Sequence, residues 1–402
     1  MSKDKPRDYG SGSVYQRKSD GRWIGTIEAG YTATGARRRV TVTARTEAEV
    51  KRKLRDRRVK IEQDGLALAG GTRVTVKTWA EKWLARTERT SRPMAYKGDR
   101  TAVTQWIVPT IGHKRLESLT PEDIRSVTEF CRSKGLQTSS IKRYHGTLLR
   151  LLRTAIVDGY GVPSRVLAVD GPDANKTDRA PLALPHALAV LAVAGQLPHG
   201  TRWAAALLQG MRQGECLGLT WECIDFARGT IAISWQLQGL PYIDGRNKAL
   251  GFRVPDDHES RHLLGALHLV RPKSTKSHRL IPLLPWMRDA LLAWREIAPA
   301  SRHGLVWPDV NGEPVRIEHD NEEWKALQGT AEVGHSAGRY YYGHEMRNTT
   351  ATLLLEAGVD ESVRIAILGH SSINTTRVYE YVDVEQARAA LTLVAARLQL
   401  NS

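Results

Sequence analysis

The sequence of 402 residues has few cysteines and no long hydrophobic run. Its three cysteines, Cys131, Cys216 and Cys223, are an odd number without metal-site spacing, so neither a disulfide framework nor a zinc module is predicted. The longest apolar stretch, residues 182–195, is interrupted by a proline and a histidine and is shorter than the roughly 20 residues needed to cross a bilayer. The polar N-terminus does not resemble a signal peptide. We therefore expect a protein of a reducing cytoplasm without a membrane span.

Acidic residues are scarce in the first part of the chain. Residues 1–176 contain 36 Lys and Arg against 19 Asp and Glu, whereas residues 177–402 carry a net charge of −1. The whole formal excess of +16 therefore lies in the N-terminal part. Such an asymmetry is typical of proteins that hold a polyanion, and nucleic acid is the first candidate. An anionic membrane surface or a merely solvated basic surface would also explain the charge, but the sequence has no lipidation motif.

Several common catalytic motifs are also absent. The sequence has neither a glycine-rich phosphate-binding loop with a lysine nor the Gly-x-Ser-x-Gly motif of serine hydrolases. Asn348 stands four residues after His344, where a metalloprotease helix would have its second histidine. No clustered carboxylates with the spacing of a metal-dependent nuclease or transposase stand out. The sequence therefore predicts no metal and no cofactor.

The N-terminal segment, residues 1–68, is predicted to form a small sheet with one helix. Three β-rich stretches, residues 13–16, 23–29 and 38–43, are separated by turn sequences. A helix is predicted from about Thr46, because Thr-Glu-Ala-Glu has the spacing of a capping box. A two-stranded ribbon of such a sheet can enter the major groove of DNA. The basic residues expected to contact DNA here are Arg17, Lys18, Arg22, Arg37, Arg38 and Arg39.

Residues 72–172 are predicted to form a helical domain. Thr120 followed by Pro121 is typical of a helix start, with threonine as the cap and proline at the first helical position. Residues 139–157 have the pattern of a basic amphipathic helix, whose charged face contacts either DNA or only solvent. The residues expected to contact DNA are Lys142, Arg143 and Arg150. A polar stretch that begins at Asp170 is predicted to be a linker.

Residues 178–402 are predicted to form a mixed α/β, mostly helical domain. Helices are expected over residues 185–194 and 202–219, and strands within residues 229–238 and 267–283. The predicted fold class is therefore mainly α with small β elements, in three domains.

A loop and a C-terminal helix are also predicted in this domain. Residues 239–265 are rich in glycine, proline and charge, and they are predicted to form a long mobile loop. Residues 384–400 have the pattern of an amphipathic helix, which either docks on a neighbouring molecule or packs on its own domain.

Four short patterns in the last domain combine into one chemistry. They are Gly-Met-Arg-Gln-Gly-Glu at 210–215, Pro-Lys-Ser-Thr-Lys at 272–276, His-Glu-Met-Arg at 344–347, and Leu-Gly-His at 368–370 followed by Thr-Thr-Arg-Val-Tyr at 375–379. Each pattern alone has an ordinary structural explanation, such as an arginine paired with a glutamate on a helix surface.

Together, two arginines, two histidines and a lysine around a tyrosine suit the cleavage of a phosphodiester. Guanidinium groups can hold both non-bridging oxygens and neutralise the charge that develops on them. A tyrosine hydroxyl, with a pKa of about 10, needs an adjacent base or cationic neighbours to act as a nucleophile. A lysine on a hairpin can protonate the leaving 5′ oxygen.

In this order the four patterns resemble the tyrosine recombinase, or phage integrase, family. The resemblance covers most of the chain, and the order of the three domains is similar to that of integrases with an N-terminal arm-binding domain. It implies a site-specific DNA recombinase that forms a 3′-phosphotyrosine intermediate and integrates or excises a phage or mobile element without metal or ATP. It implies that Glu215 supports the first arginine, and that the catalytic residues are Arg212, Lys273, His344, Arg347, His370 and Tyr379.

The resemblance also implies the roles of the domains and the partners. Residues 1–68 would bind arm-type DNA sites, residues 72–172 would bind the core site, and residues 178–402 would carry the catalysis. The implied partners are double-stranded DNA and further copies of this chain in a tetramer, with a host DNA-bending protein and an excision factor as additional candidates. No membrane partner is expected, and the implied location is the cytoplasm of a bacterial host, on DNA.

The catalytic lysine and the nucleophilic tyrosine each have one alternative residue, and the function of the protein has two alternatives. The stretch between Arg212 and Lys273 is longer than is usual in the family, which leaves Lys276 as the alternative lysine. Tyr381 lies two positions beyond Tyr379 and would point to the opposite face of a helix, while the Thr-Thr-x-x-Tyr pattern favours Tyr379. The alternative functions are a type IB topoisomerase-like enzyme with the same chemistry and a DNA-binding regulator without catalysis.

Overall fold

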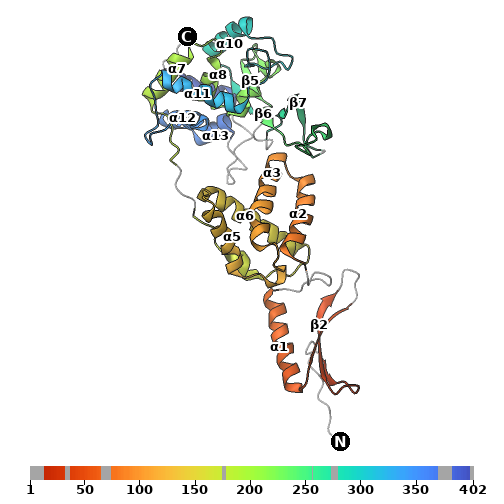
Figure 1. Ribbon diagram of the computed structural model, residues 1–402. Coiled ribbons are helices and arrows are strands. Elements are labelled where there is room, and N and C mark those ends of the chain that lie inside the picture. Colours follow the sequence, from red (N-terminus) through yellow and green to blue (C-terminus); the bar gives the residue numbers. More distant parts are fainter. Residues whose placement is uncertain are drawn as a thin grey trace. The chain divides into compact units, whose positions relative to one another are not determined.

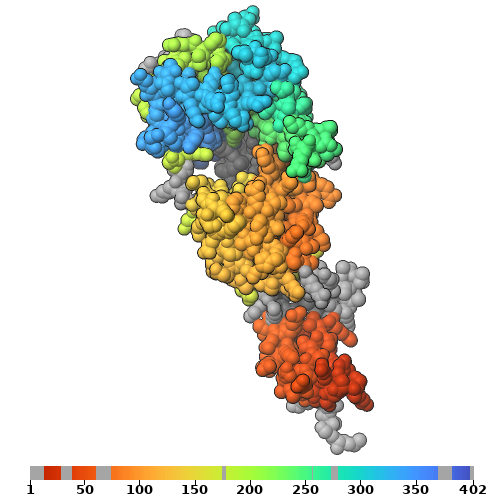
Figure 2. All heavy atoms as spheres, viewed as in Figure 1, coloured from red at the N-terminus to blue at the C-terminus, as the bar shows by residue number. Residues whose placement is uncertain are grey.

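The computed structural model describes most of the chain, namely residues 13–31, 37–64, 74–173, 178–255, 257–272, 279–369 and 383–398. The chain divides into two compact units, residues 1–176 and 177–402, each described by itself below. The same colours follow the chain through both units in Figure 1 and Figure 2. Among the described residues, no helix combines the length and the apolar character needed to cross a bilayer.

The N-terminal part of the first unit contains a three-stranded antiparallel sheet and a helix (Figure 1). Strands β1 (Ser13–Gln16), β2 (Trp23–Tyr31) and β3 (Arg37–Ala44) pair in the order β1-β2-β3, and helix α1 (Glu47–Asp64) packs against them. Its small core consists of buried side chains from the sheet and the helix: Ile27, Ala44, Val50 and Leu54. The predicted sheet and helix are confirmed.

Residues 74–173 form the helical part of the first unit. Its α-helices are α2 (Val76–Thr90), α3 (Pro93–Thr101), α4 (Val108–Ile111), α5 (Pro121–Ser133) and α6 (Thr138–Val157). Shorter helical turns are η1 (Ala102–Ile107), η2 (Leu116–Ser118) and η3 (Ser164–Ala168). The predicted cap of α5 is confirmed, because Thr120 Oγ1 accepts a bond from the Asp123 N–H at 3.3 Å and the Asp123 carboxylate accepts one from the Thr120 N–H at 2.9 Å.

The second unit is built mainly of helices around one hydrophobic core. Its α-helices are α7 (Leu184–Ala194), α8 (Thr201–Leu208), α9 (Gln213–Leu217), α10 (Pro285–Ile297), α11 (Ile317–Thr330), α12 (Gly343–Glu356), α13 (Glu361–Leu368) and α14 (Val384–Arg397). Of the two alternatives for the C-terminal helix, the structure shows packing on its own unit, since α14 buries one face against α12, α13 and the strand beginning at Arg279.

Two small antiparallel sheets complete this unit. The first has strands β4 (Ile224–Asp225), β5 (Thr230–Ile233) and β9 (Arg279–Pro282) in the order β4-β5-β9, and the turn η4 (Trp221–Cys223) precedes β4. The second has strands β6 (Gln236–Gly239), β7 (Ser260–Leu264) and β8 (Leu267–Val270) in the order β6-β8-β7. The predicted fold class, mainly α with small β elements, is confirmed.

The prediction of one helix over residues 202–219 was wrong. The structure has two helices, α8 and α9, separated by a turn at Gly210 with a φ of 60°. A Cβ atom at this position would also lie 2.5 Å from Leu368 Cδ2, so both the conformation and the packing require glycine. The turn matters for the site because it places Arg212 at the start of α9 instead of inside a helix.

The prediction of one long loop over residues 239–265 was also wrong. Tyr242 and Phe252 pair in a β-bridge, and the short turn η5 (Lys248–Leu250) lies between them. Ser260 to Leu264 form β7, which pairs with β8. The longer stretch before Lys273 therefore contributes one strand, β7, to the β6-β8-β7 sheet.

Candidate active site

Arg212 and Glu215 begin helix α9 and are bonded to each other. The Arg212 backbone N–H donates to Glu215 Oε2 at 2.9 Å, and Arg212 Nη1 donates to Oε1 at 2.6 Å. The Glu215 side chain is only 2% exposed, whereas that of Arg212 is 33% exposed. The carboxylate therefore fixes one edge of the guanidinium while part of this group stays at the surface.

Arg279, the first residue of β9, is a second partner of the same carboxylate. Its Nη1 and Nη2 donate to the two Glu215 oxygens at 3.1 and 2.8 Å, and its Nε donates to the Ile367 carbonyl at 2.7 Å. Burial by itself would raise the pKa of Glu215, but the bonds and charges of Arg279 and Arg212 lower it to about 2. Glu215 is therefore an anion at physiological pH.

Sequence reasoning assigned no role to Arg279. A signal was present, because Arg279 is the one charged residue of a strand that continues Leu-Ile-Pro, and charged side chains in such positions are seldom buried without a partner. The identity of the partner could not be foreseen, since Glu215 lies 64 positions earlier in the chain.

Helix α12 supplies His344 and Arg347, which its spacing places on one face. Arg347 is 2% exposed, and its Nη1 and Nη2 donate to the carbonyls of Gly210 and Leu368. Burial and the charges of Arg212 and Arg279 lower the pKa of Arg347 to about 9. Among the described residues, the Arg347 Nε–H has no hydrogen-bond partner. Arg347 is thus a buried cation in a positively charged site, and an anion bound nearby would stabilise it.

His344 lies at the surface beside this cation. Its side chain is exposed, and it occupies the first turn of α12. Partial burial and the positive charge of Arg347 lower the pKa of His344 below its usual value. The imidazole is therefore mainly neutral at pH 7 and can accept a proton.

Two carbonyls that the arginines hold belong to the segments flanking the site. Arg212 Nη2 donates to the Gly369 carbonyl at 3.0 Å, while Arg347 holds the Gly210 carbonyl. Gly369 ends α13 with a φ of 62°, a left-handed conformation that favours glycine. The bonds to the Leu368 and Gly369 carbonyls fix the backbone immediately before His370.

The structure thus brings together Arg212, Glu215, His344 and Arg347, which the sequence singled out. The other predicted catalytic residues, Lys273, His370 and Tyr379, lie outside the described residues, as do the alternatives Lys276 and Tyr381. In the sequence, Lys273 precedes β9 and His370 directly follows the end of α13 at Gly369.

The residues predicted to contact DNA in the N-terminal part lie around one turn and on one edge strand. Those near the β1–β2 turn are exposed, namely Arg17, Lys18 and Arg22. Arg17 pairs with Asp20 across this turn, which holds its shape. The remaining three belong to β3, namely Arg37, Arg38 and Arg39.

The predicted contacts in α6 differ from one another. Lys142 and Arg143 are exposed. Arg150 is partly engaged within the unit, because it donates to Asp99 and its guanidinium lies 5.6 Å from the centre of the Trp83 ring, although its side chain is 55% exposed. Its role in DNA binding stays a prediction.

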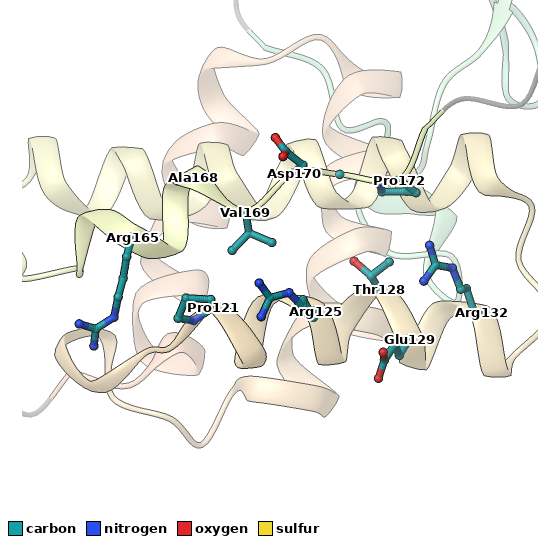
Figure 3. A pocket seen from close by; sticks show the side chains of 11 residues that line it. Pro121, Arg125, Thr128, Glu129, Arg132, Arg165, Ala168, Val169, Asp170 and Pro172 are labelled. Carbon is teal, nitrogen blue, oxygen red and sulfur yellow. The ribbon is translucent and has the colours of Figure 1, made fainter.

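The helical part also contains a groove of about 450 Å³ between α5 and residues 165–172 (Figure 3). Figure 3 shows Arg125 and Arg132 rising from α5 toward the overlying segment, from which Val169 points down into the space. Arg165 lines the same groove. The groove adds a basic surface to the first unit and contains none of the predicted catalytic residues.

Among the described residues, no group of three or more His, Cys, Asp or Glu side chains could hold a metal ion. The charges that converge in the site are those of the arginines, and they are held in place by Glu215 and backbone carbonyls.

Known proteins are similar to this chain in sequence and in fold. Residues 201–386 match the phage integrase family. The chain is 24% identical over 424 residues to an integrase from Saccharopolyspora erythraea, covering 95% of each protein. It is 34% identical over 149 residues to tyrosine recombinase XerC 2 from Ralstonia nicotianae, covering 36% of this chain and 40% of that protein.

The fold is similar to that of the Tn1549 transposon integrase, solved in complex with transposon right end DNA. The TM-score is 0.61 at 20% sequence identity, and the match covers 80% of this chain and 99% of the other. These comparisons do not favour a regulator without catalysis or a topoisomerase-like enzyme. Residues 201–386 belong to the phage integrase family, and the chain is a tyrosine recombinase, an enzyme that exchanges DNA strands at specific sites.

Proposed function

We propose that Arg212 and Arg347 hold the phosphate that this recombinase cuts and that Tyr379 attacks it. One observation carries the proposal. Arg212, Arg279 and Arg347 gather around the single carboxylate of Glu215, so three positive charges face one negative charge. The surplus suits a phosphodiester, which gains charge on its oxygens in the transition state.

The reaction that fits these groups has two reversible steps. The Tyr379 hydroxyl attacks phosphorus, a 3′-phosphotyrosine forms, and the bond to the 5′ oxygen breaks. His344 is suited to accept the tyrosine proton because the pKa of its imidazole is lowered. Lys273 gives a proton to the leaving 5′ oxygen, and His370 donates a hydrogen bond to the phosphate. A 5′-hydroxyl of the partner strand then reverses the step, so no ATP is consumed.

We assign three roles along the chain. Residues 1–68 bind arm-type sites, residues 72–172 bind the core site, and residues 178–402 cut and rejoin the strands. The net charge of +17 in residues 1–176 supports DNA binding there. Two duplexes have four strands to exchange, so we propose a tetramer on DNA.

The proposed setting is a bacterial cytoplasm in which the enzyme integrates or excises a phage or mobile element. A host DNA-bending protein and an excision factor are proposed as further partners, because a separate arm-binding domain implies DNA that bends back to the core site.

A nicked suicide DNA substrate tests the chemistry. The 5′-hydroxyl fragment diffuses away after cleavage, and the covalent adduct is trapped. We expect an adduct with wild-type protein in the presence of EDTA. Loss of cleavage with EDTA, restored by magnesium, would refute the phosphotyrosine mechanism. Relaxation of supercoiled DNA without strand exchange between duplexes would favour the topoisomerase-like alternative.

A further inference from the structure

The chain enters the second unit through residues 178–182, and this segment is hydrogen-bonded to the catalytic helix α12. The Ala180 N–H donates to Glu345 Oε1 at 3.0 Å, and the Leu182 N–H donates to Thr349 Oγ1 at 2.8 Å. Two bonds from three consecutive positions thus hold the entering chain against the first two turns of α12. We call residues 178–182 the junction.

Glu345 is the centre of these contacts. Its carboxylate is completely buried, and it accepts bonds from Arg339 Nη1 and Nη2, both at 2.9 Å, and from the Tyr342 N–H at 2.6 Å, besides the bond from Ala180. Burial by itself would raise the pKa of Glu345, but the bonds from Arg339 and the backbone lower it. Glu345 is therefore a buried anion that depends on every one of these donors.

Arg339 extends the contacts back to the start of the junction. Its Nε donates to Asp178 Oδ2 at 2.9 Å, while its other two nitrogens hold Glu345. The Arg339 side chain is 18% exposed and that of Asp178 is 58% exposed. One guanidinium thus connects an exposed residue of the junction with a buried residue of the catalytic helix.

Glu345 lies in the same helical turn as His344 and Arg347. A shift of the Glu345 backbone moves both neighbours, because the residues of one helical turn share a hydrogen-bonded frame. Arg347 is held by the Gly210 and Leu368 carbonyls of two other segments, so it cannot follow such a shift without straining those bonds.

We propose that Glu345 and Arg339 are positioning residues that tie the junction to His344 and Arg347, so that the state of the junction sets the rate of strand cleavage. The inference rests on the proposed roles of these two catalytic residues. The chain of residues 1–176 continues into the junction, and in this proposal DNA binding by the first unit acts on the second through it. Asp178, Arg339 and Glu345 form the path by which this action reaches α12.

The test uses full-length protein and the suicide substrate in single turnover. The cleavage rate at saturating DNA and the DNA concentration giving half of this rate are measured separately. We expect E345Q and R339M to lower the saturated rate about tenfold or more, with little change in the half-saturating concentration, because they misplace groups without removing DNA contacts. R339K, which keeps the charge and one donor, should recover part of the rate.

D178N is the decisive variant because the Asp178 side chain is 58% exposed, so its replacement is expected to leave the fold intact. We expect a reduction of about two- to threefold in the saturated rate with an unchanged melting temperature. The matched control is E356Q at the other end of the same helix, where Glu356 is 55% exposed and pairs with Arg397. E356Q should cleave like the wild type.

The outcomes separate the two proposals. If the wild type forms no adduct, the proposed function fails. If the wild type forms it but D178N and R339K both match the wild type, the path from the junction is wrong and Glu345 serves folding alone. If E345Q does not fold, D178N and R339K still decide the matter.

Discussion

The two units of the chain carry arginine in opposite settings. In residues 1–176 Arg17 and Arg22, which are expected to contact DNA, are at the surface, with side chains 46% and 58% exposed. In residues 177–402 Arg202, Arg279 and Arg347 are each 7% exposed or less. The first unit holds the whole net charge excess, yet in the second unit Arg212, Arg279 and Arg347 lie close enough to influence one another.

This difference separates two physical tasks. Exposed cations neutralise phosphates and release counterions, which gives affinity without requiring precise geometry. Buried guanidinium groups act in a low dielectric and are fixed by carboxylates and carbonyls, so they can stabilise a charge that develops at one position. Arg202 pairs with Asp320 and Arg279 with Glu215, both at 2.8 Å, whereas Arg347 is held by backbone carbonyls. Net charge therefore indicates where DNA binds and says little about where it is cut.

The largest expected effect is at the nucleophile. Tyr379→Phe removes one oxygen and keeps the ring, so the covalent adduct should disappear while DNA affinity and folding stay near wild type. Tyr381→Phe is the control and should leave the adduct intact. Mass spectrometry of the trapped peptide identifies the residue, and a phosphate on Tyr381 or on a serine would contradict the assignment.

The second effect sets a buried arginine against an exposed one. Arg347→Ala should raise the activation free energy of cleavage at saturating DNA by about 3 kcal/mol, because it removes stabilisation of transition-state charge. The cleavage rate falls accordingly. Arg143→Ala should weaken DNA binding and leave the saturated rate unchanged. Thermal unfolding of both variants controls for loss of the fold. If both variants lowered the saturated rate equally, the buried arginine would not differ from the exposed one in its role, and the assignment of catalysis to the second unit and binding to the first would be contradicted.

The third effect concerns the buried anion that holds Arg212. The pKa of Glu215 is about 2 in the folded protein against an ordinary value of 4.5, so its stabilising contribution is present above pH 4.5 and is lost as the pH falls toward 2. We expect Glu215→Gln to lower the free energy of unfolding at pH 7 by on the order of 3 kcal/mol, with a gap to wild type that narrows on acidification. Urea unfolding at pH 7 and pH 3 measures it, and a gap that is constant with pH would contradict the ion-pair explanation.

The smallest effect is a change in salt dependence. Without residues 1–71 the protein should lose one class of DNA site but still cleave at the core site, although recombination is expected to fail.

Replacing Arg17, Lys18 and Arg22 by alanine in the full chain should flatten the slope of log affinity against log salt by about 0.9 for each phosphate that is no longer neutralised. Binding isotherms at several salt concentrations test both. An unchanged set of bound sites after truncation would refute the arm-binding role.

Local signals in the sequence were sufficient for much of the fold. The turn sequences bounded the strands of the N-terminal sheet, and the cap at Thr120 was foreseen because capping involves residues three positions apart. The prediction of one helix over residues 202–219 was wrong because the local signal was not sufficient there. Its apolar pattern continues through Gly210, and the break there depends on the close approach of Leu368 from a distant part of the chain.

The sequence by itself was enough to predict the chemistry of this protein: which cations, histidines and tyrosine are candidates for the reaction, and in which order they occur. A phosphoryl-transfer site demands particular side chains, and those residues occur in short motifs that can be recognised without a fold. Only the tertiary structure decided what holds them. The bonds of Glu215 to Arg279 and of Glu345 to Ala180 span 64 and 165 positions. A buried carboxylate takes whichever donors the folded chain brings within about 3 Å, and no local pattern specifies those donors.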